Sequence, residues 1–462
     1  MTSILPESLV FENQVKSIAH RFLDDLGINQ IMKRCNFKKI KGPAPFQVLS
    51  FIFMLVFTGR NLYRTNKMYP DKMPFSKDTI YRFLNNCHYN WKKLLFLLAQ
   101  KIILRHLFRL TSKNRVNVLI IDDSMFSRNR SKAVELLSRF RDHTLNRYIK
   151  GFRMLTLGWS DGNSFVPLSF TLLAAEEKKQ LCKVNPTIDK RSNGYKRRSE
   201  AIQKSTDALL ELLEQAKPYG FPADYLLFDS WFSFPSVIVK VKECGLHTIC
   251  MLKDLPKILY SFQGSRLNLG ELYQKVEKKD CKEGVFASAI VNLNCKGHKP
   301  VPARIIFVKD RNHRKEWLAL LSTDIDLPED EIIRTYGKRW DIEMFFKTTK
   351  SLLKLSKEFQ SQSFDSMVAH TSIVFIRYIM LCMESRFSID DRSKGEIFYL
   401  CCDEIKDITF KEALLRLMAT LKEFLHKLPF LSSQVVDELL SQFFDSLPCY
   451  IKAGLTFSLC ES

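Results

Sequence analysis

The sequence predicts an α/β protein in which a mixed β-sheet is flanked by helical regions at both ends of the chain. The β-branched run 116–124 is typical of a buried strand, and it ends in acidic residues. Two further apolar runs, 153–159 and 165–173, surround the sequence SDGN at 160–163, which is a strong hairpin signal. A later apolar run, 223–228, also precedes an acid. Strands that deliver acids at their carboxyl ends are typical of α/β sheets with a catalytic site.

The composition favours a globular protein with a polyanionic partner. The 462 residues are enough for two or three domains, and 71 Lys and Arg against 50 Asp and Glu leave a net charge of +21. Such a surplus favours nucleic acid as the partner. The cysteines contain no CxxC pair, which disfavours a zinc finger and fits a reducing cytoplasm. The longest apolar run, 46–58, is too short to span a bilayer, so no membrane role is expected.

The regions outside the predicted sheet have helical periodicity. A capped helix start at 76–78 precedes a segment with several cations and aromatic residues. A helix of this kind binds duplex DNA when it enters a groove, although a packing role fits the pattern equally well. The residues concerned are Tyr81, Arg82, His88, Trp91, Lys92 and Lys93.

The polar residues of a predicted helix near residue 340 lie along one stripe. Pro328 and the acids at 329–331 are typical of a helix N-terminus, and the pattern predicts one helix from there to about residue 355. At about 100° per residue, one narrow face collects a phenol, an acid and three cations. On geometry alone, a solvated helix face with i,i+4 ion pairs explains such a stripe. The stripe consists of Tyr336, Arg339, Glu343, Lys347 and Lys350.

The spacing of four of these residues resembles the Y-x2-R-x3-E-x6-K signature of DDE-type transposases from bacterial insertion sequences. Tyr336, Arg339, Glu343 and Lys350 match it in order. The resemblance covers roughly residues 115–355. It implies a ribonuclease H-like mixed sheet core interrupted by a β-rich insertion, with helical N-terminal and C-terminal regions.

The resemblance and the periodicity together divide the chain into five parts. These are residues 1–112, a helical region expected to bind DNA ends; 113–255, the first part of the core; 256–323, the β-rich insertion; 324–355, the second part of the core with the glutamate helix; and 356–462, a helical region expected to help subunits pair. Within the insertion, three runs are strand-like, namely 267–276, 285–293 and 303–308.

Three carboxylates are the candidate catalytic and metal-binding residues: Asp122, Asp229 and Glu343. Phosphodiester cleavage needs charge neutralised on an in-line transition state, which two divalent ions about 3.5–4 Å apart can do. Mg²⁺ prefers carboxylate oxygens, and Mn²⁺ can substitute for it. Neighbouring strand residues point to opposite faces, so only one of Asp122 and Asp123 is expected to be a ligand. The family pattern D-x-S favours Asp122, whereas an Asp directly before Ser would select Asp123.

The resemblance implies DNA transposition as the activity. Water would cut at the insertion-sequence ends, and the released 3′ hydroxyl would attack target DNA, while Tyr336, Arg339, Lys350 and Lys347 would hold phosphates. Trp317 resembles the Trp that some members use to stack a flipped base, which would permit a hairpin route; a buried core Trp fits equally well.

The expected partners are duplex DNA, as terminal inverted repeats and target, and a second copy of the chain in a homodimer on DNA. The expected location is the bacterial cytoplasm, on the nucleoid when bound to DNA. Two other functions remain open at this point. One is a catalytically silent DNA-binding protein of transposase descent, and the other is a ribonuclease H-like nuclease that cuts without joining.

Overall fold

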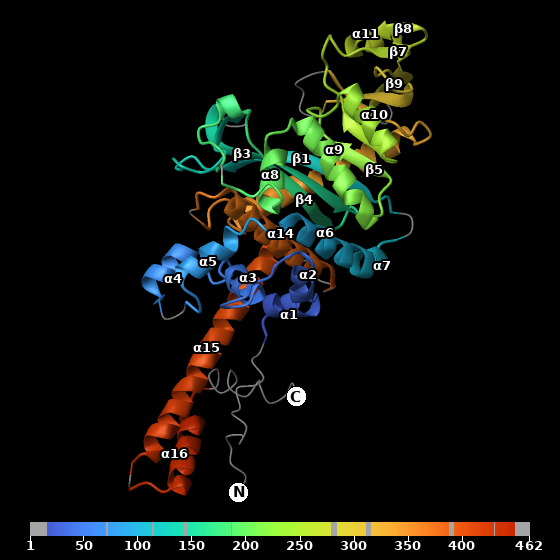
Figure 1. Cartoon of the computed structure of the whole chain (residues 1–462). Coiled ribbons are helices and arrows are strands. Elements are labelled where there is room, and N and C mark those ends of the chain that lie inside the picture. Colours follow the sequence, from blue (N-terminus) through green and yellow to red (C-terminus); the bar gives the residue numbers. More distant parts are fainter. Residues whose placement is uncertain are drawn as a thin grey trace.

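The computed structural model describes residues 16–448, apart from 71–72, 113–114, 143–145, 186, 279–283, 311–315, 360, 388–391 and 429. In this part of the chain, eleven strands form one mixed sheet (Figure 1). The strand order is β2-β3-β1-β5-β6-β11-β10-β9-β7-β8, and β4 also pairs with β3. The strands are β1 (Val118–Ser127), β2 (Ser138–Asp142), β3 (Arg147–Ser160), β4 (Phe165–Leu173), β5 (Tyr225–Phe228), β6 (His247–Met251), β7 (Tyr260–Phe262), β8 (Ser265–Leu267), β9 (Val285–Leu293), β10 (Val301–Lys309) and β11 (Trp317–Ser322).

Helices precede, cover and follow this sheet. The α-helices are α1 (Ile18–Asp25), α2 (Ile28–Arg34), α3 (Pro45–Met54), α4 (Leu62–Met68), α5 (Lys77–Leu84), α6 (Trp91–Ile102), α7 (Phe108–Leu110), α8 (Asn193–Ala201), α9 (Ser205–Ala216), α10 (Pro235–Glu243), α11 (Leu269–Lys275), α12 (Glu329–Gly337), α13 (Trp340–Ser351), α14 (Phe364–Phe387), α15 (Lys394–His426) and α16 (Ser433–Ser446). Short turns of other helix types are η2 (Ile103–Leu107), η3 (Glu177–Lys179) and η4 (Lys217–Tyr219).

The predicted mixed core is confirmed in its strand order. Strand β1 pairs antiparallel with β3 and parallel with β5, and β5 pairs parallel with β6. The predicted hairpin joins β3 to β4, and its register shifts where Gly158 faces Pro167, which is the bulge that a proline in a strand predicts. Because β1, β5 and β6 are parallel, their carboxyl ends lie at the same edge of the sheet.

The insertion continues the core sheet. Strand β11 pairs antiparallel with β6, and β10 and β9 follow it outward. The predicted strands at 285–293 and 303–308 are confirmed in β9 and β10. The predicted strand at 267–276 is wrong, because its larger part is helix α11. Asn268 and Glu271 form a capping box there, each side chain accepting from the other's backbone N–H at 2.9 Å, and this local signal overrides the apolar pattern.

Two predicted helices are each divided into two. The predicted helix from 329 to about 355 is interrupted at Lys338 and Arg339, between α12 and α13. Gly337, a poor helix former, ends α12, and Lys338 turns inward to donate to the carbonyl of Val116 at the start of the sheet. The segment 199–217, whose periodicity also predicts a single helix, is likewise divided between α8 and α9.

The N-terminal helices share one hydrophobic core with the sheet and with α14. Arg377 of α14 is fully buried, donates to the carbonyls of Ile52 and Phe53 at the end of α3, and pairs with Glu358 at 2.6 Å. Trp91 is only 1% exposed, which agrees with the packing role and not with the groove-binding role that the sequence pattern left open for it. Most of α14, Phe364–Arg386, has the length and apolar character of a membrane span, but 94% of its most apolar 18 residues are buried inside the protein, as in a core helix.

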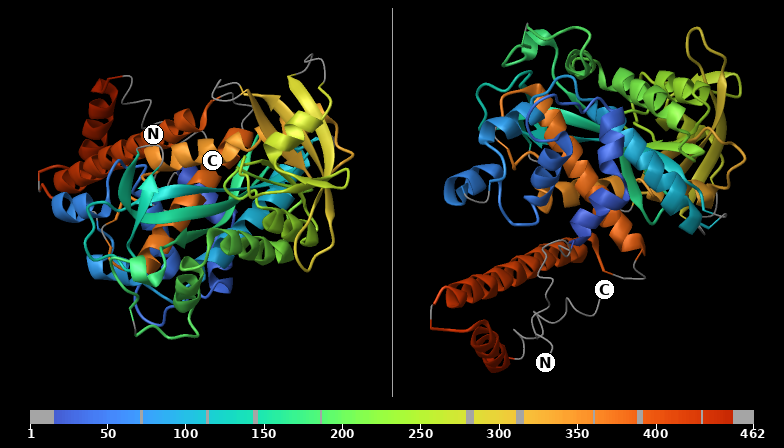
Figure 2. Two further views of the ribbon diagram at one scale, coloured as in Figure 1. Left: turned by 90° about the horizontal axis from the view of Figure 1, so that it is seen from above. Right: turned by 60° about the horizontal axis from the view of Figure 1, so that its bottom comes forward.

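Helices α15 and α16 form a long hairpin that leaves the body of the protein, as the red helices of Figures 1 and 2 show. Their own core is small. It consists of Met418, Val436 and Leu440, with three partly buried leucines packed against it.

Candidate active site

Two of the predicted acids lie side by side at the carboxyl edge of the sheet. The parallel pairing of β1 and β5 matches Ile120 with Leu227. Two residues further along, the same register brings Asp122 of β1 beside Asp229, which directly follows β5. Asp229 accepts a hydrogen bond from the backbone N–H of Trp231 at 2.9 Å, which fixes its carboxylate at the strand end.

Arg339 connects this pair to the third predicted acid. Its Nη1 lies 3.2 Å from Oδ2 of Asp122, and its Nη2 lies 2.5 Å from Oε1 of Glu343. Glu343 stands one turn after Arg339 along α13, so the two side chains share a helix face. Helix α13 packs on β1, so Asp122 and Glu343 share one guanidinium, and Asp229 lies beside Asp122 on the neighbouring strand.

Burial disfavours the ionised form of the acids in this cluster. Burial raises the pKa of Asp122 to about 7, and the charge of Asp229 adds to the shift, against the opposing effect of Arg339. Burial is also the main cause that raises the pKa of Asp229. Desolvated carboxylates that share a site favour protonation or a bound cation. The cluster is therefore suited to a cation beyond the one that Arg339 supplies.

The donor set fits a hard divalent ion in its chemistry. Carboxylate oxygens are the ligands that Mg²⁺ and Mn²⁺ prefer. In the described part of the chain, no three His, Cys, Asp or Glu side chains stand close enough together to hold an ion. Arg339 lies between Asp122 and Glu343 and supplies the positive charge there.

Asp123 points to the other face of β1. Its carboxylate pairs with Arg153 of β3 at 2.7 Å. Asp122, by contrast, shares its face with Asp229 and α13. Arg153 also lies over the ring of Trp231, with Cζ 4.9 Å from the centroid. Sequence reasoning missed Arg153 and Trp231, because only strand register brings them to the site.

Tyr336 and Lys350 flank the cluster. The Cζ of Arg339 lies 5.8 Å from the centroid of the Tyr336 ring, and burial raises the pKa of that phenol above its usual value. Lys350 donates from Nζ to Oγ of Ser124, two residues after Asp122, at 2.6 Å. Burial lowers the pKa of Lys350, and the charges of Asp142 and Asp123 oppose that effect. Ser124 is a second residue that the sequence pattern did not single out.

Two predicted site residues do not join the cluster. The side chain of Lys347 is exposed on α13. Trp317 begins β11 and packs against Tyr273 and Phe307, each ring centroid 5.0 Å from its own. Its surroundings are those of a partly buried packing residue of the insertion.

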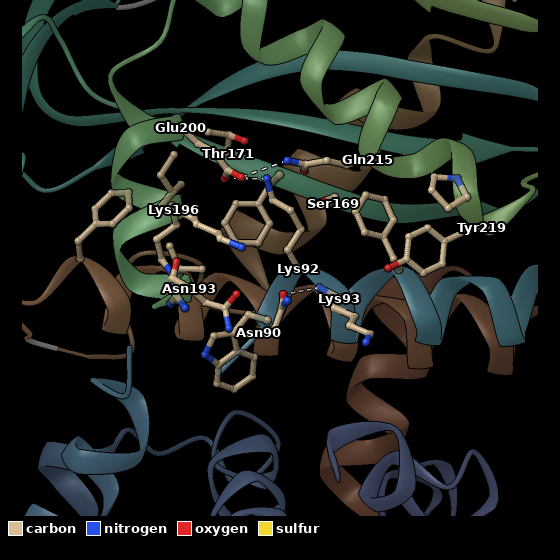
Figure 3. A pocket seen from close by; sticks show the side chains of 18 residues that line it. Asn90, Lys92, Lys93, Ser169, Thr171, Asn193, Lys196, Glu200, Gln215 and Tyr219 are labelled. Carbon is tan, nitrogen blue, oxygen red and sulfur yellow. Dashed lines mark hydrogen bonds and ion pairs between the residues drawn. The ribbon is translucent and has the colours of Figure 1, made fainter. Parts of the chain in front are cut away.

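A separate cavity of about 320 Å³ lies between α6, α8, α9 and β4 (Figure 3). Lys92 pairs there with Glu200 at 2.8 Å, and Gln215 donates to the same carboxylate. None of the acids of the candidate site lines this cavity. The candidate active site therefore lies at the sheet edge, outside this cavity.

Two family models of the DDE type match overlapping parts of the chain. The family described as DDE superfamily endonuclease matches residues 53–254, and the family described as Transposase DDE domain matches residues 194–380. A search among curated proteins found no match. Among solved structures, the chain is similar to the Drosophila P element transposase in its strand transfer complex, with 10% identity and a TM-score of 0.23. That similarity covers 56% of this chain and 55% of the other, so it spans about half of the P element protein.

Proposed function

Because the chain belongs to the DDE group of transposases, we propose that Asp122, Asp229 and Glu343 are the acids with which it cuts and joins DNA. The observation that carries the proposal is that Arg339 joins Asp122 to Glu343 while the β1–β5 register puts Asp229 beside Asp122. Two divalent ions, Mg²⁺ or Mn²⁺, would supply charge neutralisation at the phosphate when bound between the carboxylates. Asp122 is the first ligand in this proposal, because Asp123 is engaged by Arg153 on the opposite face.

The cations around the acids position the DNA. Arg339 offers a planar fork that matches a phosphate, and Lys350 offers a point charge from the same helix. In the cleavage step, water attacks the phosphorus atom and the bond to the 3′ oxygen breaks, which leaves a 3′ hydroxyl and a 5′ phosphate. In the joining step, that 3′ hydroxyl attacks a phosphate of the target and displaces another 3′ oxygen, which takes up a proton.

The proposed macromolecular partners are duplex DNA and a second copy of the chain. The net charge of +21 supports the first. The α15–α16 hairpin supports the second, because large apolar side chains stand exposed along it, among them Phe410, Leu417 and Phe424 at 60%, 64% and 60%. Residues 394–446 carry nine acids and six bases, so this surface repels DNA and suits a protein.

We propose that the DNA partners are the terminal inverted repeats and the target, and that the protein works in a reducing compartment such as the bacterial cytoplasm. The described cysteines are free thiols, which supports that compartment.

A cleavage and joining assay tests the function. Purified protein is incubated with Mg²⁺, duplexes that end in the element's own repeats, and a second DNA as target. Wild type is expected to cut at the repeat boundary and to join, and Asp229→Asn and Glu343→Gln are expected to lose at least about a hundredfold in rate. Asp123→Asn is the matched control, because its carboxylate lies on the other face of β1.

Each alternative function has its own outcome in this assay. Cutting without joined product would indicate a nuclease, and tight repeat binding without cutting would indicate a silent DNA-binding protein. Cutting that survives both ligand substitutions would mean that the active site lies elsewhere.

A further inference from the structure

The hairpin formed by β2 and the start of β3 carries a cationic face. Its register pairs Arg139 with Lys150 and Arg141 with Tyr148, while Phe140 faces Ile149. Because strand side chains alternate between faces, Arg139, Arg141, Tyr148 and Lys150 lie on one face of the hairpin. Arg139, Arg141 and Tyr148 are exposed, Tyr148 by 74%, whereas Ile149 on the other face is buried.

Among the described residues, no ion pair joins the cations of this face to an acid. Arg139 and Lys150 stand directly opposite each other, an arrangement that costs stability in an isolated hairpin. Arg141 donates to the amide oxygen of Asn146 at 2.9 Å, and Lys150 donates to the carbonyl of Ser131 at 2.9 Å, so both hydrogen-bond to neutral oxygens. The cations of this face are therefore suited to anionic groups of a binding partner.

The same hairpin borders the candidate active site. Strand β3 pairs with β1 up to Ser127 opposite Gly151, and the hairpin continues β3 from that point. It therefore extends from the sheet edge where β1 delivers Asp122. Along β3, Tyr148 and Lys150 alternate in step with Thr156, the partner of Asp122, so the cationic face continues the face of β1 that carries Asp122. A duplex held at Lys350 is thus near the hairpin.

The local sequence supports a polyanion over an acidic peptide or a small anion. Residues 128–150 hold seven Lys and Arg and two acids. One of those acids, Glu135, is neutralised by Arg198 at 2.6 Å. Arg139, Tyr148 and Lys150 also line an open surface hollow together with Asn129. A broad, open cationic face with one exposed aromatic hydroxyl suits the repeated phosphates of a duplex.

We propose that Arg139, Arg141, Tyr148 and Lys150 bind the phosphate backbone of the duplex that is being cut, next to the cleavage site. This inference rests on the proposed function, since it takes the acid cluster as the place of cleavage. The two arginines each grip phosphate oxygens, Lys150 adds a point charge, and the Tyr148 hydroxyl donates a hydrogen bond. The face carries no sequence information, because all its contacts are to the backbone.

The test is the double variant Arg139→Gln/Arg141→Gln, which keeps two polar, hydrogen-bonding side chains and removes both charges. Binding to a terminal-repeat duplex is measured by fluorescence anisotropy over a series of salt concentrations. The affinity at about 0.15 M salt is expected to fall at least about tenfold, and the slope of log affinity against log salt is expected to fall by about 2. Tyr148→Phe is expected to reduce the affinity by a smaller factor and to leave the slope unchanged.

The matched control is Lys217→Gln/Lys240→Gln. These exposed lysines lie at the end of α9 and on α10, towards the sheet edge opposite the acids. The control should bind with the affinity and slope of wild type. Thermal unfolding of both double variants should match wild type, which separates lost contacts from lost folding.

Two outcomes overturn the inference. One is wild-type affinity and slope in Arg139→Gln/Arg141→Gln. The other is normal repeat binding and cleavage with joining alone lost, which would assign the face to target DNA. Failure of the proposed function gives a different result. A wild type that does not cut DNA with Mg²⁺ would contradict the proposed activity, and the affinity measurements would still show whether this face binds DNA.

Discussion

Arg339 donates from Nη1 to Oδ2 of Asp122 across 3.2 Å, and this contact joins the helix that carries Glu343 to the central strand of the sheet. The same guanidinium holds Glu343, so one cation balances two carboxylates. A guanidinium in this position competes directly with divalent ions for those oxygens. The contact is therefore expected to weaken metal binding in the DNA-free protein and to support DNA cleavage.

Arg339→Gln is expected to strengthen binding of Mn²⁺ to the DNA-free protein and to weaken DNA cleavage. The substitution frees Asp122 and Glu343 from their internal cation, and it also removes a phosphate contact. Electron paramagnetic resonance of free Mn²⁺ measures the first effect, with a gain of about tenfold in affinity expected, since a hydrogen bond to a charged group contributes about 1.5–3 kcal/mol.

Lys347→Gln serves as the control for this experiment, because Lys347 is exposed on the same helix. Its Mn²⁺ affinity should equal that of wild type. If Arg339→Gln bound Mn²⁺ no better than wild type, the guanidinium would not be a competitor for the site.

The stability of the metal-free protein should depend on pH through Asp122. Its pKa is raised by burial from the usual 3.8 to about 7 in the folded state. A raised carboxyl pKa favours folding fully below the unfolded value and loses that contribution as pH rises through the folded value. From about pH 4 to pH 8, wild type should therefore lose about 2–4 kcal/mol of unfolding free energy that Asp122→Asn does not lose.

Urea unfolding at several pH values, with a chelator present, measures this difference. Asp326→Asn is the control, since Asp326 is exposed and lies outside the cluster. Parallel pH profiles for wild type and Asp122→Asn would contradict the raised pKa.

The sequence predicted the strands and the helical segment that carry the site residues better than it predicted the contacts between those residues. Alternation placed Asp122 and Asp123 on opposite faces, and the apolar run before Asp229 gave its strand correctly. Helical spacing grouped Glu343 with Arg339, even though the single predicted helix is two. These predictions succeed because each depends on neighbours within one turn or one strand.

The parts that the sequence did not predict depend on register and packing. Arg153 reaches Asp123 only through the pairing of β1 with β3, and Ser124 meets Lys350 only because α13 packs on β1. The helical period also cannot tell a buried face from an exposed one within a short segment, which is why the pattern left both a packing role and a groove-binding role open for Trp91, which is buried. The strand expected at 267–276 failed because a local capping box decides that segment.

Lys350→Met should weaken binding to the terminal-repeat duplex and reduce its salt dependence by about one unit of slope. Lys350 is partly buried beside Ser124, and Met keeps the length of its apolar stem without the charge. Anisotropy over a salt series measures both changes. Ser124→Ala removes the hydrogen bond but keeps the charge, so it should leave the slope unchanged; an equal loss of slope in both variants would argue against a direct phosphate contact.

Arg198→Met should destabilise the fold without touching the acids of the site. Arg198 is 4% exposed and pairs with both Glu135, at 2.6 Å, and Asp365, at 2.8 Å. Removing it leaves two carboxylates buried without this partner, which costs about 3–5 kcal/mol of unfolding free energy. Urea unfolding measures the loss. Arg191→Met is the control, because Arg191 is exposed, and it should change the unfolding free energy by less than about 0.5 kcal/mol.

The α15–α16 hairpin should hold two copies of the chain together. Its own core of Met418, Val436 and Leu440 is too small to account for the apolar side chains exposed along α15. We expect Leu417→Ser/Phe424→Ser to shift the protein from dimer to monomer, because a self-complementary apolar face loses its contacts in both copies at once. Sedimentation velocity over a range of concentrations measures the shift.

A substitution outside the hairpin provides the control for the dimer experiment. Tyr63→Ser removes an aromatic side chain of comparable exposure, 66%, from α4, and it should leave the dimer intact. The monomeric variant should retain the thermal stability of the body, since the hairpin has a hydrophobic cluster separate from the main core. A wild type that sediments as a monomer at all concentrations, with and without terminal-repeat DNA, would refute the pairing. A dimer that survives Leu417→Ser/Phe424→Ser would place the interface on another surface.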